Sequence, residues 1–212
     1  MVLLFDLDGT LTDSRPGILG CMRYALDALG IKPPSDDALS QFIGPPTHDA
    51  FRALLGPSNA SLQTRAIELY RERFSTIGMF ENRVYPGIRE GLTALRAVGV
   101  RLWVATSKPR VYAEQIIDHF ELRPFFMGVY GSELTGEFGD KGDLIALLLK
   151  TENLDHSTVW MVGDRMHDVG GAHRNGLRAA GVLWGYGSRS ELTAAGADLL
   201  VVSMPELIAA LT

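Results

Sequence analysis

The spacing of apolar residues changes twice along this chain of 212 residues. Val2–Phe5 is an uninterrupted apolar run bounded downstream by Gly9, and this pattern predicts a short buried strand. Between residues 15 and 78, apolar residues recur at helical spacing between Gly and Pro turns. From Tyr85 onward, short apolar runs alternate with segments of helical period. We therefore expect an α/β protein with a helical segment inserted after its first strand.

The inserted segment is expected to hold four helices, which can bury their apolar faces on one another as a small bundle. Their expected ranges are 15–30, 35–44, 47–55 and 62–78. Ser35 and Thr47 are residue types that cap helices, and Ile77 continues the apolar stripe of the last helix. We expect a four-helix cap domain at residues 15–80, with hinges near 12–16 and 80–85. The core domain would then consist of residues 1–14 and 81–212.

The second half of the chain predicts the remaining layers of the core. Strands are expected at 100–105, 127–130, 158–162, 178–183 and 199–202, and helices at 86–97, 109–120, 141–149, 166–175, 190–195 and 204–211. Apolar strands that alternate with helices are typical of a parallel sheet covered on both faces. The expected core is therefore a Rossmann-like, three-layer αβα sheet.

Two carboxylates, Asp6 and Asp8, follow the first predicted strand. Residues two apart in an extended chain point to the same side, so this pair can converge. Close carboxylates repel each other unless a cation or a shared proton compensates, and Mg²⁺ needs only one or two carboxylates. Gly9 lets the chain turn away, and Thr10 adds a hydroxyl. The stretch predicts a divalent cation site, with a surface turn as the alternative because Asp, Gly and Thr are turn-formers.

Polar residues also stand at the ends of the later predicted strands, or open the helices that follow them. They are Thr106, Ser107, Lys108, Lys141, Asp164 and Asp168. Each has an ordinary explanation on its own, as a helix cap, a solvated lysine or an acid at a helix N-terminus. Ligands of parallel α/β sheets bind outside the carboxyl ends of the strands. Together with Asp6 and Asp8, these residues occupy four such places, and they therefore favour a single site at that edge.

Composition and charge disfavour several classes of function. The net charge is −5 and there is no basic tract, which disfavours binding to a nucleic acid polymer. Cys21 is the only cysteine, so no intrachain disulfide is possible and a cytoplasmic protein is expected. No basic segment precedes Val2–Phe5 and acids follow it directly, which disfavours a signal peptide. No apolar run is long enough to span a bilayer, so we expect no membrane partner.

Four motifs together resemble those of the haloacid dehalogenase-like hydrolases, a superfamily dominated by phosphatases. They are DLDGT at 6–10, ATS at 105–107, Lys141 and GDRMHD at 163–168. The inserted helices resemble the first-type cap of that superfamily. FIGPP at 42–46, YPGI at 85–88, ATSKP at 105–109 and WGYGS at 184–188 resemble its phosphoglycolate phosphatase-like branch, some members of which are 5′-nucleotidases.

The resemblance implies a Mg²⁺-dependent phosphatase that acts on a small, soluble phosphate monoester. Asp6 would attack phosphorus to form an aspartyl-phosphate, and Asp8 would act as general acid and then general base. Thr106 would bind the phosphoryl group, and Lys141 would offset its charge together with that of Asp6. The expected metal ligands are Asp6, Asp8 through its backbone carbonyl, Asp164 and, through waters, Asp168. The expected substrate-binding residues are Gly9, Thr10, Ser107, Lys108, Arg15 and Gly44.

Several activities share this pattern. A phosphoglycolate phosphatase is our first expectation, and a 5′-nucleotidase or pyrophosphatase is the alternative. A dehalogenase would lack Asp8 and the later metal-binding acids, and phosphonate cleavage would need a lysine in the cap, where only Lys32 occurs. A sugar-phosphate mutase uses the same motifs, whereas a phosphate-binding protein without catalysis would have lost Asp6 or Asp8. The sequence is compatible with a monomer or a homodimer.

Overall fold

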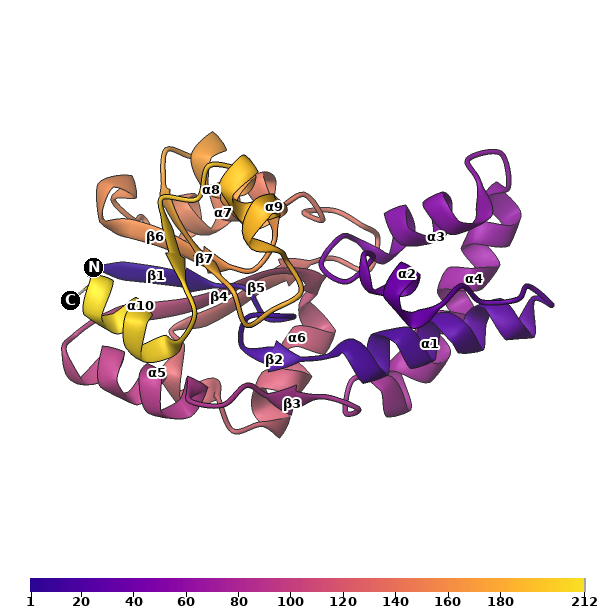
Figure 1. Cartoon of the computed structure of the whole chain (residues 1–212), viewed down its shortest axis with the longest axis horizontal. Coiled ribbons are helices and arrows are strands. Elements are labelled where there is room, and N and C mark those ends of the chain that lie inside the picture. Colours follow the sequence, from indigo (N-terminus) through magenta and orange to yellow (C-terminus); the bar gives the residue numbers. More distant parts are fainter. Residues whose placement is uncertain (212) are drawn as a thin grey trace.

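The apolar runs of the sequence form a parallel sheet at the centre of the core. The computed structural model describes residues 1–211, which hold six strands in this sheet: β1 (Val2–Phe5), β4 (Arg101–Pro109), β5 (Gly128–Ser132), β6 (Val159–Gly163), β7 (Arg178–Val182) and β8 (Leu199–Val201). Their order is β5-β4-β1-β6-β7-β8, and all neighbouring pairs are parallel (Figure 1). The α/β prediction is therefore confirmed.

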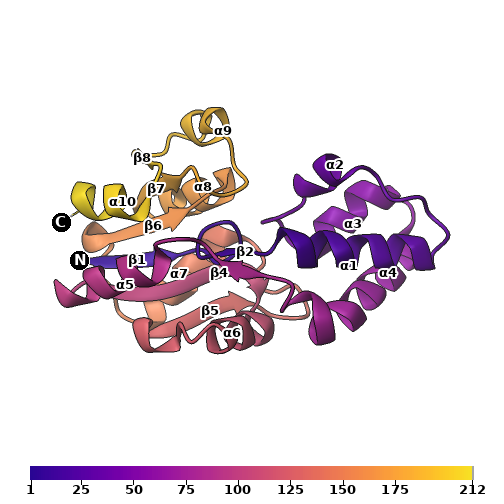
Figure 2. The same cartoon turned by 60° about the horizontal axis from the view of Figure 1, so that its bottom comes forward.

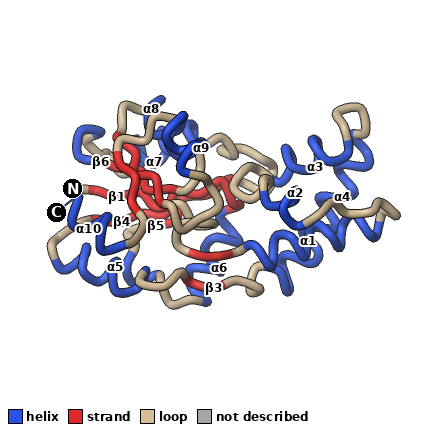
Figure 3. The backbone as a smooth tube through the Cα atoms, in the orientation of Figure 1, coloured by secondary structure: helices blue, strands red, loops and turns tan. Residues whose placement is uncertain are grey.

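The central strand is apolar throughout because helices cover the sheet on both faces. Leu3 and Phe5 pack on one side against α5 (Ile88–Ala97), α6 (Arg110–His119) and α10 (Met204–Leu211). Val2 and Leu4 pack on the other side against α7 (Lys141–Thr151), α8 (Met166–Arg174) and α9 (Arg189–Ala194). The alternation of side chains along a strand thus builds a three-layer αβα core (Figure 3).

The helical insert lies between β1 and β4 in the chain. Its described helices are α1 (Arg15–Ala28), α2 (Asp36–Ser40), α3 (Thr47–Leu55) and α4 (Ala60–Arg73), followed by a π-helical turn at Phe74–Gly78. Figures 1 and 2 show these helices gathered at the end of the molecule away from both chain termini, beyond the carboxyl end of β1. No helix within residues 1–211 is long and apolar enough to cross a membrane.

Two details of the predicted cap helices are wrong. Pro46 occupies the N-cap position of α3, and Thr47 is the first helical residue rather than the cap. Ile77 is 52% exposed and does not continue the buried stripe. The π-helical turn that follows α4 explains this, because its wider turn shifts the side chains that follow away from the 3.6-residue period. Ser35, by contrast, caps α2 as predicted and accepts the N–H of Ala38 at 3.4 Å.

A two-stranded antiparallel ribbon at the predicted hinges was not foreseen. It consists of β2 (Thr12–Asp13) and β3 (Arg83–Val84), with Thr12 opposite Val84 and Asp13 opposite Arg83. Strands of two residues are too short to leave a period in the sequence. The ribbon joins the two points at which the chain passes between the sheet and the insert.

The apolar interior of the insert gives a first prediction. Phe51 in α3 is fully buried, and its ring centroid lies 6.1 Å from that of Tyr70 in a T-shaped arrangement. We expect Phe51→Ala to lower the free energy of unfolding by about 3–5 kcal/mol, because the cavity left behind collapses only in part. Ile77→Ala, at an exposed site, should change it by less than about 1 kcal/mol. Urea unfolding measures both, and equal losses would contradict the packing described here.

Candidate active site

The strand ends that carry polar residues meet at one place. Phe5, the last residue of β1, pairs with Val104 of β4 on one side and with Val162 of β6 on the other. The chain continues from β4 to β5 in one direction and from β6 to β7 in the other, so the crevice beside β1 is a topological switch point. Asp6, Thr106 and Asp164 therefore lie at the same edge of the sheet, as the sequence predicts.

The pairing of β4 with β5 shifts in register just after Thr106. Thr106 pairs with Gly131 and Pro109 with Ser132, so Ser107 and Lys108 are extra residues between two regular pairs. The strand thus runs to Pro109, whereas the sequence predicted its end at residue 105. Irregularities of this kind re-aim side chains beside active sites.

Lys108 is buried at this irregularity rather than solvated. Its Nζ lies 2.6 Å from Oδ2 of Asp8 and 4.7 Å from the ring centroid of Phe74 in the insert. The Oδ1 atom of Asp8 has no hydrogen-bond partner among the described residues. Lys108 thus joins one carboxylate of the site to the insert, while the second oxygen of that carboxylate is unpaired.

Three other carboxylates form a buried trio. Oxygen atoms of Asp6, Asp164 and Asp168 all lie within 4.8 Å of one another. Lys141 lies among them, with its Nζ 2.9 Å from Oδ1 of Asp6 and 2.8 Å from Oδ1 of Asp168. The same ammonium donates to the carbonyl oxygen of Ala105 at 2.9 Å. One ammonium beside three buried carboxylates leaves an excess of negative charge.

The ionisation of the trio reflects that excess. Burial, reinforced by the charges of Asp168 and Asp6, raises the pKa of Asp164 well above its usual value. Burial and the charge of Asp6 also raise the pKa of Asp168, to about 6, although Lys141 opposes the shift. Burial acts to lower the pKa of Lys141, but the charges of Asp168 and Asp6 outweigh it and raise that pKa.

These observations fit a bound divalent cation. Mg²⁺ prefers oxygen ligands. The buried carboxylates of the trio offer such oxygens, and one ammonium does not balance their negative charge. The carboxylate of Asp8 is not in the trio, because it pairs with Lys108. A metal contact through the backbone carbonyl of Asp8 therefore stays a prediction.

The turn after β1 packs directly on the trio. Gly9 has a φ of 83°, in the left-handed region, and a Cβ added there would clash with the carboxylate of Asp164. The hydroxyl of Thr10 lies 3.4 Å from Oδ1 of Asp164 and donates to it. Both residues thus contact the trio, and their contact with a substrate stays a prediction.

A cavity between the insert and the sheet opens beside Asp8. Its lining includes Asp8, Ser107, Lys108, Phe42, Gly44, Tyr70, Arg71, Phe74 and Tyr112. Gly44 lies in this lining, and its contact with a substrate stays a prediction. Arg15 does not line the cavity, because its guanidinium pairs with Asp37 of α2 at 3.2 Å.

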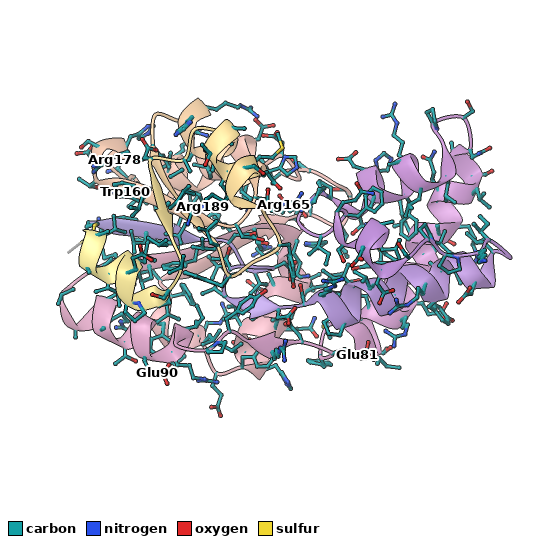
Figure 4. All side chains as sticks on the ribbon, viewed as in Figure 1. Glu81, Glu90, Trp160, Arg165, Arg178 and Arg189 are labelled. Atoms are coloured by element: carbon teal, nitrogen blue, oxygen red, sulfur yellow. The ribbon has the colours of Figure 1, made fainter. Side chains whose placement is uncertain are left out.

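The sequence did not predict a role for two arginines at the boundary between the insert and the core. Arg71 of α4 lines the cavity and donates to the carbonyl oxygen of Leu134 in the core at 2.7 Å. Arg165 follows Asp164, and Figure 4 shows it where the core meets the insert. Its Nε bonds Oε1 of Glu191 at 2.9 Å, and its Nη1 donates to the carbonyl oxygen of Ile43. No local signal identifies either arginine, because each contact joins segments far apart in the sequence.

Comparison with known proteins identifies the family of this chain. The sequence model of a family described as haloacid dehalogenase-like hydrolase matches residues 3–182. This chain belongs to that family. It is 48% identical to the 5′-nucleotidase of Pseudomonas aeruginosa over 192 residues, which cover 91% of this chain and 86% of the relative. A crystal structure described as a predicted phosphatase from Clostridium acetobutylicum superposes with a TM-score of 0.93 at 42% identity, covering 97% of this chain and 95% of the other.

More distant relatives carry other names. The tyrosine-protein kinase PtkA of Mycobacterium tuberculosis is 41% identical over 88% of this chain, which covers 63% of that kinase. The phosphoglycolate phosphatase of Caulobacter vibrioides is 29% identical over 95% of this chain and 86% of its own length. The chain is thus a haloacid dehalogenase-like phosphatase. These identities favour the 5′-nucleotidase alternative over our first expectation of a phosphoglycolate phosphatase.

The buried ion pair gives a further prediction. We expect Lys108→Met to lower the free energy of unfolding by about 3–5 kcal/mol, because Asp8 is left charged, buried and unpaired. The double variant Lys108→Met/Asp8→Asn should recover part of that stability, since the charge is gone. Urea unfolding of both variants checks this, and a double variant that is less stable than Lys108→Met would contradict it.

Proposed function

We propose that this haloacid dehalogenase-like phosphatase is Mg²⁺-dependent and hydrolyses nucleoside 5′-monophosphates. The observation that carries the chemistry is the buried trio of Asp6, Asp164 and Asp168 around Lys141, with Asp8 beside it at the same edge of the sheet. The identity to the Pseudomonas 5′-nucleotidase supports the substrate class.

In the proposed reaction, Asp6 is the nucleophile. Lys141 binds Oδ1 of Asp6 and so orients its carboxylate for in-line attack on phosphorus, which forms an aspartyl-phosphate. Asp8 donates a proton to the leaving oxygen and later accepts one from the attacking water. Its unpaired Oδ1 is available for that proton.

The remaining residues of the site are proposed to bind the cation, the phosphoryl group and the leaving group. Asp6, Asp164 and Asp168 would hold the cation, which when bound neutralises the phosphoryl oxygens. Thr106 and Ser107 are buried at the register shift of β4, beside Asp6, and are proposed to donate hydrogen bonds to the phosphoryl group. Lys108 reaches from Asp8 toward the cavity, where it is proposed to contact the leaving group.

The insert is proposed to act as the specificity domain, with the boundaries 15–80. Its part of the cavity wall is largely apolar and aromatic and includes Phe42, Tyr70 and Phe74. Tyr70 stacks on Phe74, whose ring also contacts Tyr112 and Lys108, so these rings form the closed apolar wall of the cavity. The substrate class therefore rests on the identity to the Pseudomonas 5′-nucleotidase.

A substrate panel tests the proposal. Release of inorganic phosphate is measured with the four common nucleoside 5′-monophosphates, phosphoglycolate, pyrophosphate and an aryl phosphate. We expect kcat/KM for at least one nucleotide to exceed that for phosphoglycolate at least about tenfold, or about 1.4 kcal/mol in transition-state binding. A preference for phosphoglycolate or pyrophosphate would overturn the substrate class.

The kinase relative supplies the second candidate. A protein kinase on this fold would pass the phosphoryl group to a tyrosine hydroxyl instead of water. The panel is therefore repeated with a tyrosine peptide and a nucleoside triphosphate. Transfer of a phosphoryl group from the triphosphate to the peptide, without hydrolysis of any monoester, would favour the kinase.

A further inference from the structure

The loop at residues 184–187, which joins β7 to α9, crosses the active site. Trp184 donates through Nε1 to the carbonyl oxygen of Thr10 at 2.9 Å, and the backbone N–H of Tyr186 donates to Oδ2 of Asp164 at 2.7 Å. A Cβ added at Gly185 or Gly187 would clash with Asp164. The backbone of this loop therefore lies directly on one carboxylate of the trio.

The side chain of Tyr186 extends from the same residue to the hinge of the insert. Its phenol oxygen donates to Oδ1 of Asp13 at 3.0 Å and accepts the backbone N–H of Arg15 at 3.0 Å. Asp13 in β2 also accepts from Arg83 in β3, with Nη2 2.7 Å from Oδ2. The phenol is thus fixed where both passages of the chain between sheet and insert lie side by side.

We propose that Tyr186 is a positioning residue that ties Asp164 to the hinge of the insert, so that the affinity of the site for a divalent cation depends on the bond between the phenol and Asp13. This inference rests on the metal site of the proposed function. Partners that hydrogen-bond a metal-binding carboxylate fix its orientation and raise the affinity of the site. Here that partner is a backbone N–H, and the ring of the same residue anchors it to Asp13 and Arg15.

Tyr186→Phe tests the inference because it removes only the hydroxyl and keeps the backbone N–H on Asp164. Binding of Mg²⁺ alone is measured by calorimetry on the full chain without substrate. We expect Mg²⁺ to bind about tenfold more weakly than to the wild type, at the lower end of the effect of losing such a partner. An unchanged dissociation constant would overturn the proposal.

Tyr130→Phe is the matched control. The hydroxyl of Tyr130 in β5 also donates to a carboxylate, Oε1 of Glu152 at 2.6 Å, but neither residue contacts the trio. This variant should lose stability without a change in Mg²⁺ affinity. An equal loss of affinity in both Tyr→Phe variants would show that general loosening of the fold is responsible, and would overturn the role of Tyr186.

A double-mutant cycle tests whether the effect acts through Asp13. Asp13→Ala should weaken Mg²⁺ binding as Tyr186→Phe does. In the double variant the two losses should combine to less than their product, because the bond between the phenol and Asp13 is lost in both, although each variant also loses a bond of its own, to Arg83 or to Arg15. Losses that multiply would overturn the coupling. A wild-type protein that binds no Mg²⁺ would refute the proposed metal site itself, whereas wild-type binding with an unchanged Tyr186→Phe refutes only this inference.

Discussion

The Asp6→Asn protein is expected to fold like the wild type and to lose at least about 10⁴-fold in phosphatase turnover. The size follows from the loss of a covalent nucleophile, because an amide oxygen cannot attack phosphorus as a carboxylate does. The fold should survive because Asn is nearly isosteric with Asp. Lys141 also keeps its contacts with Asp168 and with the carbonyl oxygen of Ala105.

Turnover of an aryl phosphate and thermal unfolding measure the two parts of this prediction. Asp27→Asn is the control, because Asp27 is an exposed carboxylate on α1 and its replacement is chemically the same. Asp27→Asn should keep wild-type turnover. A folded Asp6→Asn protein with wild-type turnover would exclude the aspartyl-phosphate and would require another nucleophile.

The residues that the sequence placed correctly stand where a local pattern changes. Asp6 and Asp164 each interrupt a buried apolar run, and parallel strands carry such interruptions to a common edge. Lys141 opens α7, the helix that follows β5. Periodicity places these residues at the ends of strands or the start of a helix without knowledge of which strands are neighbours, and the resemblance to the superfamily supplied their expected roles.

The residues that the sequence missed or misjudged depend on contacts between distant segments. Tyr186 bonds the backbone of Arg15 across 171 positions, and Arg165 bonds Ile43 across 122. Lys108 is a substrate-binding candidate in the sequence, with a solvated lysine as the alternative, and its burial against Asp8 depends on the register shift in β4. Hydrophobic period carries no information on such contacts, because each depends on how the insert sits on the sheet.

Removal of the metal is expected to abolish activity, and Mg²⁺ should restore it. Without a cation, the buried trio has only Lys141 as a hydrogen-bonded positive partner, and the pKa values of Asp164 and Asp168 are raised, so a bound metal would stabilise their ionised forms. Mg²⁺ at about 100 times its dissociation constant should stabilise the fold by about 2.7 kcal/mol, which raises the melting temperature by about 5–10 °C. Activity after chelation and thermal melts with and without Mg²⁺ measure the two effects.

The pH dependence of Mg²⁺ binding follows from the same groups. A carboxyl with a raised pKa is protonated below that pKa and ionised above it, and only the ionised form binds the metal. Because burial raises the pKa of Asp168 to about 6, and that of Asp164 is also raised, Mg²⁺ should bind more weakly at pH 5.5 than at pH 7.5. Asp164→Asn should lose most of the stabilisation by Mg²⁺ at both pH values, whereas Asp27→Asn should retain it. Full activity in the chelated wild type would mean that Lys141 alone offsets the charge of the phosphoryl group, and Asp164 and Asp168 would then have a structural role only.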